Sequence, residues 1–231
     1  MKKFELTSEF ITNIFGTKLF RIKALIEFGN VKAGELGGFV EKEENLNHEG
    51  NAWVYGNAWV CGDARVCGDA RVYGNASVYG NASVCGNARV CDDAWVYGNA
   101  RVCDDAWVCG NASVYGNAWV YGNARVYGDA RVCDDARVYG NAWVCGDARV
   151  CGDARVYGNA DYATVHGFGS EYRTTTFFKT KAGEIGVRCG CFYGNLSEFR
   201  KKVVETHGET KKAKEYLMLA DLMEFRFSDN S

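Results

Sequence analysis

The six residues Asn51-Ala52-Trp53-Val54-Tyr55-Gly56 begin a stretch that repeats one pattern eighteen times, without an insertion, as far as Gly158. In every copy the second residue is Ala and the fourth is Val, whereas the first is Asn or Asp and the sixth is Gly or Asp. A short fixed period is typical of stacked units, each of which is too small to bury an apolar face alone. This stretch therefore predicts a solenoid.

The pattern also predicts how each repeat is built. Its Ala and Val are two residues apart, so in an extended segment both point inward, and the residue between them points outward. The other three positions form a corner, because they hold residue types that tolerate left-handed backbone. Each repeat is then a short strand followed by a bend, and successive turns of the chain pair as parallel ladders.

The repeat resembles a known family. The phrase from Val54 to Trp59 is similar to the hexapeptide repeat of left-handed parallel β-helix proteins, the LpxA-like superfamily, in which three hexapeptides form one triangular coil. The flanking sequences Leu36–Glu41, Thr175–Lys179 and Gly190–Phe192 resemble uncharacterised hexapeptide-repeat proteins of Gram-positive bacteria and their phages. The resemblance implies an all-β solenoid, a left-handed parallel β-helix of about six regular coils.

Three regions are predicted. Residues 1–50 form a β-rich N-terminal cap that ends in an irregular first coil starting near Gly38, and residues 51–164 form the hexapeptide-repeat β-helix. Residues 165–231 form a small α+β module with a hairpin and two helices. Asn195 followed by Glu198 marks the start of the first helix, and Gly208 marks its end.

Stacking with a period of eighteen residues collects the outward residues into three columns. All six tryptophans lie in these columns, where an Arg one coil away can stack on a Trp ring. Soluble monomers seldom expose so many large aromatic side chains together, so we predict a binding surface. Its residues are Trp53, Arg71, Arg89, Trp107, Arg125 and Trp143 in one column, with Trp119 and Arg137 from another. The alternative is that Arg and Trp only cover one another, or that a trimer hides these faces.

Charge and hydropathy narrow the range of partners. The net charge is −2, and the repeat block holds nine Arg against eleven Asp, so nucleic acid is not an expected partner. No apolar run is long enough to span a membrane, and the first five residues lack the apolar core of a signal peptide. We therefore expect no membrane association and a cytoplasmic location.

Nine of the eleven cysteines occupy the fifth position of the repeat, where the other nine copies have Tyr. A residue exchanged freely with Tyr has no obligatory sulfur partner, and side chains in a ladder run parallel, so we predict reduced thiols. The C-x2-C spacing of a structural zinc site is absent, and no metal or cofactor is predicted. Cys189 and Cys191, two apart on an expected strand, are a weak candidate for a soft-metal or thiol pair.

The family resemblance also raises enzymatic activity, because many trimeric hexapeptide-repeat proteins are acyltransferases with a catalytic His. The sequence has only His48, His166 and His207, all outside the repeat block. His166, just past the last coil, is the one candidate general base. Three scattered histidines also do not fit the three-His metal site of carbonic anhydrases with this fold.

The leading prediction is a non-enzymatic, self-associating binding protein, expected to be a trimer, whose partner is another protein or a small anionic ligand. The phage resemblance suggests a sharper form, an antagonist that sequesters a host-defence protein or an anionic nucleotide signal. Grooves between the solenoids would offer Arg for phosphate and Trp for base stacking. The alternative is an acyltransferase that uses His166.

Overall fold

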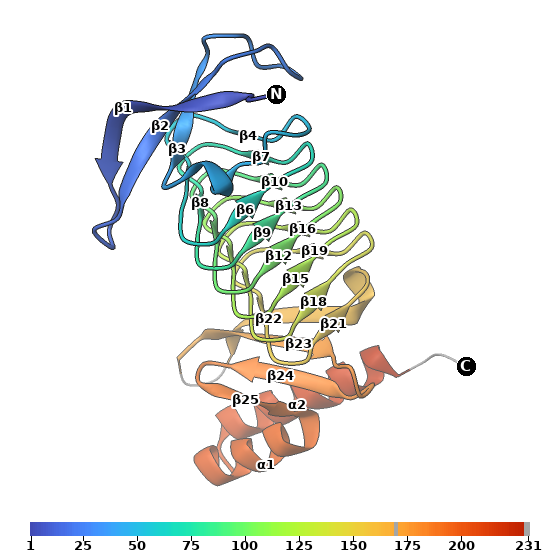
Figure 1. The fold of residues 1–231 in the computed structure, drawn as a ribbon. Helices are drawn as coiled ribbons and strands as arrows, with labels where there is room; N and C mark the ends of the chain where they lie inside the picture. Colours follow the sequence, from blue (N-terminus) through green and yellow to red (C-terminus); the bar gives the residue numbers. More distant parts are fainter. Residues whose placement is uncertain (169–170, 229–231) are drawn as a thin grey trace.

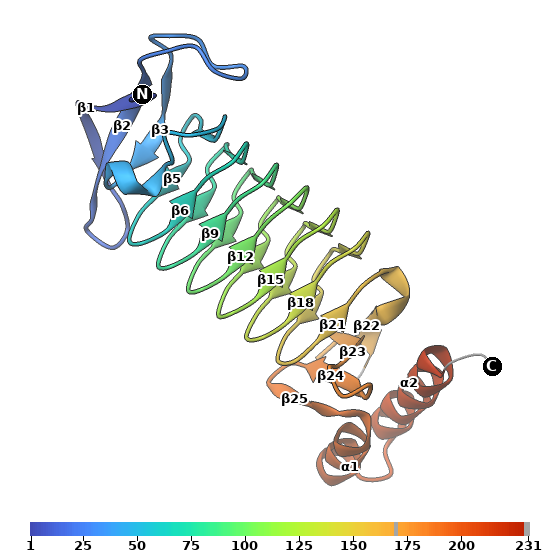
Figure 2. The same cartoon turned by 45° about the vertical axis from the view of Figure 1, so that its right-hand side comes forward.

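The computed structural model describes residues 1–168 and 171–228, and it shows a parallel β-solenoid with a small unit at each end (Figure 1). The Ala and Val of every repeat are buried and form one continuous core cluster. Seen from the side, the coils are stacked one on the next along the whole repeat block (Figure 2). The predicted β-solenoid is therefore confirmed, and its core is a column of small side chains.

Each repeat supplies one two-residue strand, and strands eighteen residues apart pair in parallel. The first sheet contains β4 (Trp53–Val54), β7 (Arg71–Val72), β10 (Arg89–Val90), β13 (Trp107–Val108), β16 (Arg125–Val126) and β19 (Trp143–Val144). The second contains β5 (Trp59–Val60), β8 (Ser77–Val78), β11 (Trp95–Val96), β14 (Ser113–Val114), β17 (Arg131–Val132) and β20 (Arg149–Val150). The third contains β6 (Arg65–Val66), β9 (Ser83–Val84), β12 (Arg101–Val102), β15 (Trp119–Val120), β18 (Arg137–Val138) and β21 (Arg155–Val156). Six repeat strands on each face confirm six regular coils.

The corners between strands are built from the first and sixth positions of the repeat. At the sixth position of every repeat but the last the backbone is left-handed, as at Gly98 with a φ of 71°, which Gly adopts without steric cost. At the first position the side chains form ladders. For example, Asn81 donates from Nδ2 to Oδ1 of Asn99 at 3.1 Å, and Asn99 donates in turn to Asn117 at 3.0 Å. The corners therefore add hydrogen bonds to those of the strands.

The N-terminal segment extends the second sheet. Strands β1 (Phe4–Thr12) and β2 (Lys18–Ala24) form an antiparallel hairpin, and β3 (Leu36–Val40) pairs with β2 on one side and in parallel with β5 on the other. A 3-10 helix, Glu43–Asn45, follows, and Leu46 then forms a parallel bridge with Val66. Val40 and Leu46 therefore stand in register with Val60 and Val66 of the first regular coil.

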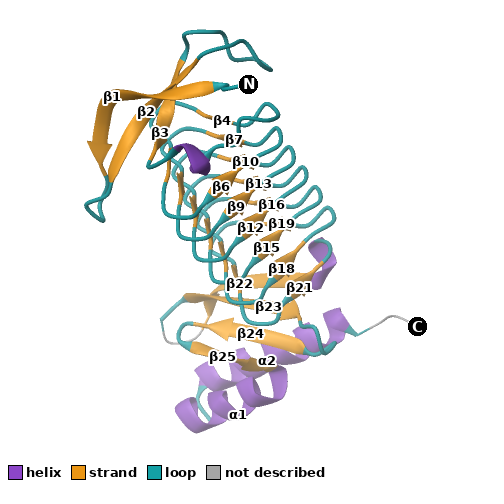
Figure 3. Cartoon of the chain, in the orientation of Figure 1, coloured by secondary structure: helices purple, strands orange, loops and turns teal. Residues whose placement is uncertain are grey.

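The C-terminal unit is a four-stranded antiparallel sheet with two helices on one face (Figure 3). Its elements, after a 3-10 helix at Asn159–Asp161, are β22 (Tyr162–Phe168), β23 (Arg173–Lys179), β24 (Ile185–Cys189), β25 (Phe192–Asn195), α1 (Leu196–His207) and α2 (Lys211–Phe227). The other face of the sheet covers the last coil, since Phe178 belongs to the solenoid core and Thr176 Oγ1 accepts from the Arg149 amide at 2.9 Å. No helix in the described part of the chain is long and apolar enough to cross a membrane.

Two details of this unit differ from expectation. The predicted boundary at residue 164 falls inside β22, because that strand starts at Tyr162 and pairs with β23. Cys189 and Cys191 do not share a strand face. Cys189 pairs with Phe192 across a two-residue turn of Gly190 and Cys191, and Gly190 there has a φ of 57°. The tight turn carries Cys191 out of the sheet.

Candidate functional site

The outward side chains form the columns that the repeat predicts. On the first sheet the register runs Trp53, Arg71, Arg89, Trp107, Arg125 and Trp143. On the third sheet, Trp119 lies between Arg101 and Arg137. Trp119 and Arg137 therefore belong to another face of the solenoid, and the predicted binding residues are divided between two faces.

Trp53 does not belong to the exposed surface. The side chain is fully buried, with the Phe28 ring 5.3 Å and the Phe4 ring 6.2 Å from its own ring. The expectation that this residue is exposed is wrong, because the N-terminal segment folds back over the first coil. The repeat pattern itself does not indicate that the N-terminal segment covers Trp53.

Arg and Trp side chains on the first sheet stack on one another along the column. The Arg89 guanidinium lies 4.5 Å from the Trp107 ring, and Arg125 lies 5.2 Å from Trp107 and 5.0 Å from Trp143. These are cation–π distances. Arg125 is thus held between two indole rings. On the third sheet, Trp119 has the complementary arrangement between two arginines, at 4.8 and 5.1 Å.

A groove of about 380 Å³, here called the Trp/Arg groove, lies at one corner of the first sheet. It brings together Trp107, Arg125 and Trp143, three of the residues that the sequence predicts. Trp143 is 44% exposed and Tyr127, at the neighbouring corner, is 37% exposed. The residues lining the groove are Tyr73, Cys91, Asp92, Trp107, Cys109, Arg125, Val126, Tyr127 and Trp143. Arg71 and Arg89 precede it in the same column and do not line it.

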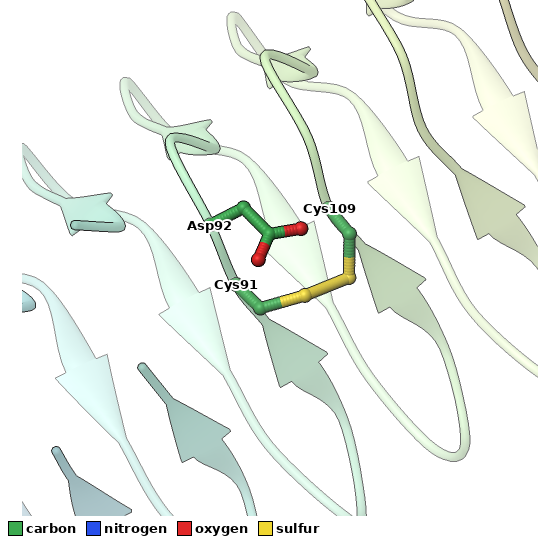
Figure 4. A group of neighbouring side chains, drawn as sticks. All are labelled: Cys91, Asp92 and Cys109. Atoms are coloured by element: carbon green, nitrogen blue, oxygen red, sulfur yellow. A yellow bond between two sulfur atoms is a disulfide. The ribbon is translucent and has the colours of Figure 1, made fainter. Parts of the chain in front are cut away.

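The wall of the groove contains a disulfide that the sequence interpretation missed. Cys91 and Cys109 are bonded (Figure 4), and a second disulfide joins Cys133 to Cys151. The prediction of reduced thiols throughout is therefore wrong. Parallel stacking brings the Cα atoms of each pair to 4.7 and 4.6 Å, within the range that a disulfide spans. The sequence does contain a signal for these disulfides, because the two cysteines of each pair are eighteen residues apart.

A third group of cysteines stays free in another corner column. Cys67, Cys85 and Cys103 follow one another on successive coils, and the Cys85 and Cys103 sulfur atoms are 2.7 Å apart. Hydrogen bonding from Cys103 lowers the pKa of the Cys85 thiol to about 7, and the same interaction raises the pKa of Cys103. Burial raises the pKa of Cys67. These three neighbouring thiols therefore differ in reactivity.

The candidate catalytic His lies away from the Trp/Arg groove. His166 is exposed on β22 and its Nδ1 is 3.0 Å from Thr174 Oγ1. It is not among the described residues that line the groove. A second cavity, of about 280 Å³, lies beside α1 and contains the cationic side chains Arg173 and Lys202 together with Cys189 and His207. His166 lines neither of these two cavities.

The fold and the repeat define the chain as a β-solenoid repeat protein. The family model of the YdcK beta solenoid repeat matches residues 64–86, 94–110, 118–131, 130–146 and 148–160. Four of the five segments lie inside the repeat block and the fifth ends two residues beyond Gly158, so the match supports the solenoid and not the flanking units. The comparison with curated proteins finds no match.

Proposed function

We propose that this chain is a binding protein whose site is the Trp/Arg groove, and that the groove takes a small anion with a planar ring, such as a nucleotide. The observation that carries the proposal is the position of Arg125 between Trp107 and Trp143 at the groove wall. The volume of the groove, about 380 Å³, falls within the usual range for small-molecule sites.

The groove has one cationic group and several aromatic ones. A guanidinium offers a fixed fork of donors to a phosphate, and an exposed indole ring offers a surface for a base. The two Trp rings restrict Arg125, so less side-chain entropy is lost when an anion binds. Asp92 on the same wall carries negative charge, which disfavours a dense polyanion such as a nucleic-acid backbone.

Binding without turnover is consistent with sequestration. We extend the proposal to self-association, with a trimer as the expected assembly, because the outward Trp and Arg side chains lie on flat sheet faces. In this form the protein would withdraw an anionic nucleotide signal, or a defence protein, from its surroundings. The alternative, an acyltransferase that uses His166, gains no support from the Trp/Arg groove, because His166 does not line it.

The proposal is tested by titrating the protein with nucleoside monophosphates, cyclic dinucleotides and inorganic phosphate, with tryptophan fluorescence as the signal. Trp143→Ser should weaken binding of the responding nucleotide about tenfold, since base stacking contributes about 1–3 kcal/mol. Trp95→Ser is the matched control, because Trp95 occupies the same repeat position on the second sheet. Ser already fills this position at Ser77, Ser83 and Ser113, so both variants should fold.

Arg125→Ser and Arg131→Ser form a second matched pair, one in the groove and one on the second sheet. We expect only Arg125→Ser to reduce the affinity for the phosphorylated ligand. An equal loss in Trp95→Ser and Trp143→Ser, or no response to any compound of the panel, would contradict the proposal. Light scattering on the same samples measures the oligomeric state, and a monomer at micromolar concentration would contradict the trimer.

A further inference from the structure

Three of the eighteen repeats have Asp, rather than Gly, at the left-handed corner position. These residues are Asp92, Asp104 and Asp134, with φ of 57°, 60° and 60°. Gly adopts this backbone without strain, whereas a residue with a Cβ does so at a conformational cost. In all three repeats the preceding residue is Cys. Asp follows Cys in all three repeats despite this conformational cost, which indicates that the carboxylate has a role that Gly cannot fill.

Each of the three carboxylates makes the same kind of hydrogen bond. Each accepts from the backbone amide of the Gly one coil further on, at 3.2 Å from Gly110, 3.1 Å from Gly122 and 3.1 Å from Gly152. Two of the three also have a second Cys on that next coil, because Cys109 and Cys151 precede Gly110 and Gly152. The residue that precedes Gly122 is a tyrosine. Asp104 therefore serves as an internal control for Asp92 and Asp134, because it makes the same hydrogen bond but has no Cys on the next coil.

At Asp92 and Asp134, two sulfur atoms and a carboxylate oxygen converge. The ligand atoms of Cys91, Asp92 and Cys109 all lie within 4.8 Å of one another (Figure 4), and so do those of Cys133, Asp134 and Cys151. We call these two groups the Cys-Asp-Cys triads. Each triad combines residues of two consecutive coils. Stacking therefore brings together two cysteines that are eighteen residues apart, as a C-x2-C motif does for two cysteines that are close in sequence.

We propose that each Cys-Asp-Cys triad, once its disulfide is reduced, binds a thiophilic divalent cation such as Zn²⁺ or Cd²⁺. Thiolate and carboxylate bind zinc at about 2.3 and 2.0–2.2 Å, so one ion can bridge three groups this close together. Three protein ligands leave one position of a tetrahedral ion for water or an added ligand. Soft thiolates select such ions over magnesium and calcium.

Reduction and metal binding are linked steps. A dithiol reductant gives two electrons and two protons to the disulfide, which becomes two thiols while the reductant forms its own disulfide. The cation then displaces two thiol protons and also binds the carboxylate. Oxidation by a disulfide reverses both steps and expels the ion. The second triad lies at a corner after β17 and β20, outside the Trp/Arg groove, so the proposal does not rest on nucleotide binding.

The test is an anaerobic titration of the full chain with Cd²⁺ after reduction by a phosphine. Sulfur-to-metal charge-transfer absorbance and competition with a chromophoric chelator report stoichiometry and affinity. We expect the reduced chain to have two tight sites that the oxidised protein lacks. Cys109→Tyr should remove one site, and it introduces a residue that already occupies nine copies of this position.

The carboxylate is tested by Asp92→Gly, which restores the common corner residue and should weaken one site about tenfold or more. Asp104→Gly makes the same change where the next coil has Tyr121 in place of a Cys, and it should leave both affinities unchanged. The double variant Cys109→Tyr/Cys151→Tyr keeps Cys67, Cys85 and Cys103 and measures binding by those thiols. Wild-type binding no tighter than in this double variant, or equal losses in Asp92→Gly and Asp104→Gly, would overturn the proposal. Far-UV circular dichroism verifies that each variant is folded.

Discussion

The corner position of the repeat shows how one residue controls the stacking of whole coils. Gly86 has a φ of 67°, and a Cβ placed there would lie 2.8 Å from the backbone nitrogen of Asp104 on the next coil. Gly146 has a similar φ of 62°, but nothing lies within 4 Å of its Cβ position. Conformational strain and close packing can therefore be separated within one protein.

Gly146→Ala should cost about 1–2 kcal/mol of unfolding free energy, from left-handed strain alone. Gly86→Ala should cost about 1–3 kcal/mol more, because its methyl group also pushes two coils apart. Urea denaturation followed by circular dichroism measures both values. Equal destabilisation of the two variants would show that crowding between coils does not matter at this corner.

The free thiols give a prediction of pH dependence at the same scale. The pKa of Cys85 is lowered to about 7 by its hydrogen bond with Cys103, so its thiolate fraction rises as the pH increases through 7. The pKa of Cys67 is raised by burial, so this thiol stays protonated at that pH. Iodoacetamide should therefore alkylate Cys85 before Cys67, with a rate for Cys85 that is half-maximal near pH 7.

Mass spectrometry can follow the two thiols separately, because Arg65, Arg71 and Arg89 place Cys67 and Cys85 in different tryptic peptides. Cys103→Tyr removes the hydrogen-bonding partner and should shift the alkylation profile of Cys85 to higher pH. Faster labelling of Cys67 than of Cys85 at pH 7 would disprove this assignment of thiolate character.

At the scale of elements, the sequence predicts best where a local rule acts. Helix α1 starts after Asn195 and ends at Gly208 as predicted, because capping depends on neighbouring residues alone. The hairpin of β23 and β24 is also found. Strand β22 was not predicted, because it directly continues the decaying repeat. Strand β25 was missed because its four residues show no clear alternation and lead directly into α1.

The cap of α1 provides a quantitative test. The Asn195 side chain accepts from the Glu198 amide at 2.9 Å, and the Glu198 carboxylate accepts from the Asn195 amide at 2.9 Å. Asn195→Ala should lower the free energy of unfolding by about 1 kcal/mol. Asn195→Asp keeps an acceptor at the cap and should stay close to the wild-type stability. Thermal unfolding of both variants tests the expectation, which fails if Asp destabilises as much as Ala.

For the whole molecule, the period of eighteen residues predicted the solenoid, its three faces and the composition of each outward column. It did not predict which members of a column are covered or bonded. Trp53 is buried by the N-terminal segment, whose sequence does not follow the repeat. The Trp/Arg groove was only partly predicted, because Cys91, Asp92 and Cys109 belong to corners whose side-chain packing the period does not specify.

A period of eighteen also predicts which deletions the solenoid tolerates. Removal of residues 111–128 takes out one whole coil and restores every strand to an equivalent partner. This variant should fold into a rod shorter by about 4.8 Å. Removal of residues 111–113 alone should disrupt pairing in all later coils, because strands would then face corners. Small-angle scattering and circular dichroism distinguish the two results, and an unfolded one-coil deletion would refute the independence of neighbouring coils.

The units at the two ends of the solenoid also determine how the molecule can grow. Each coil presents a row of amide and carbonyl groups along the rod axis, and an identical coil from another chain would match it. Strand β3 and Leu46 cover the first coil, and the sheet containing β23 covers the last. A chain reduced to residues 51–158, which lacks both terminal units, should therefore join end to end into fibres. The terminal units therefore cap both ends of the solenoid, so that the molecule has a fixed length and does not grow as an open-ended polymer.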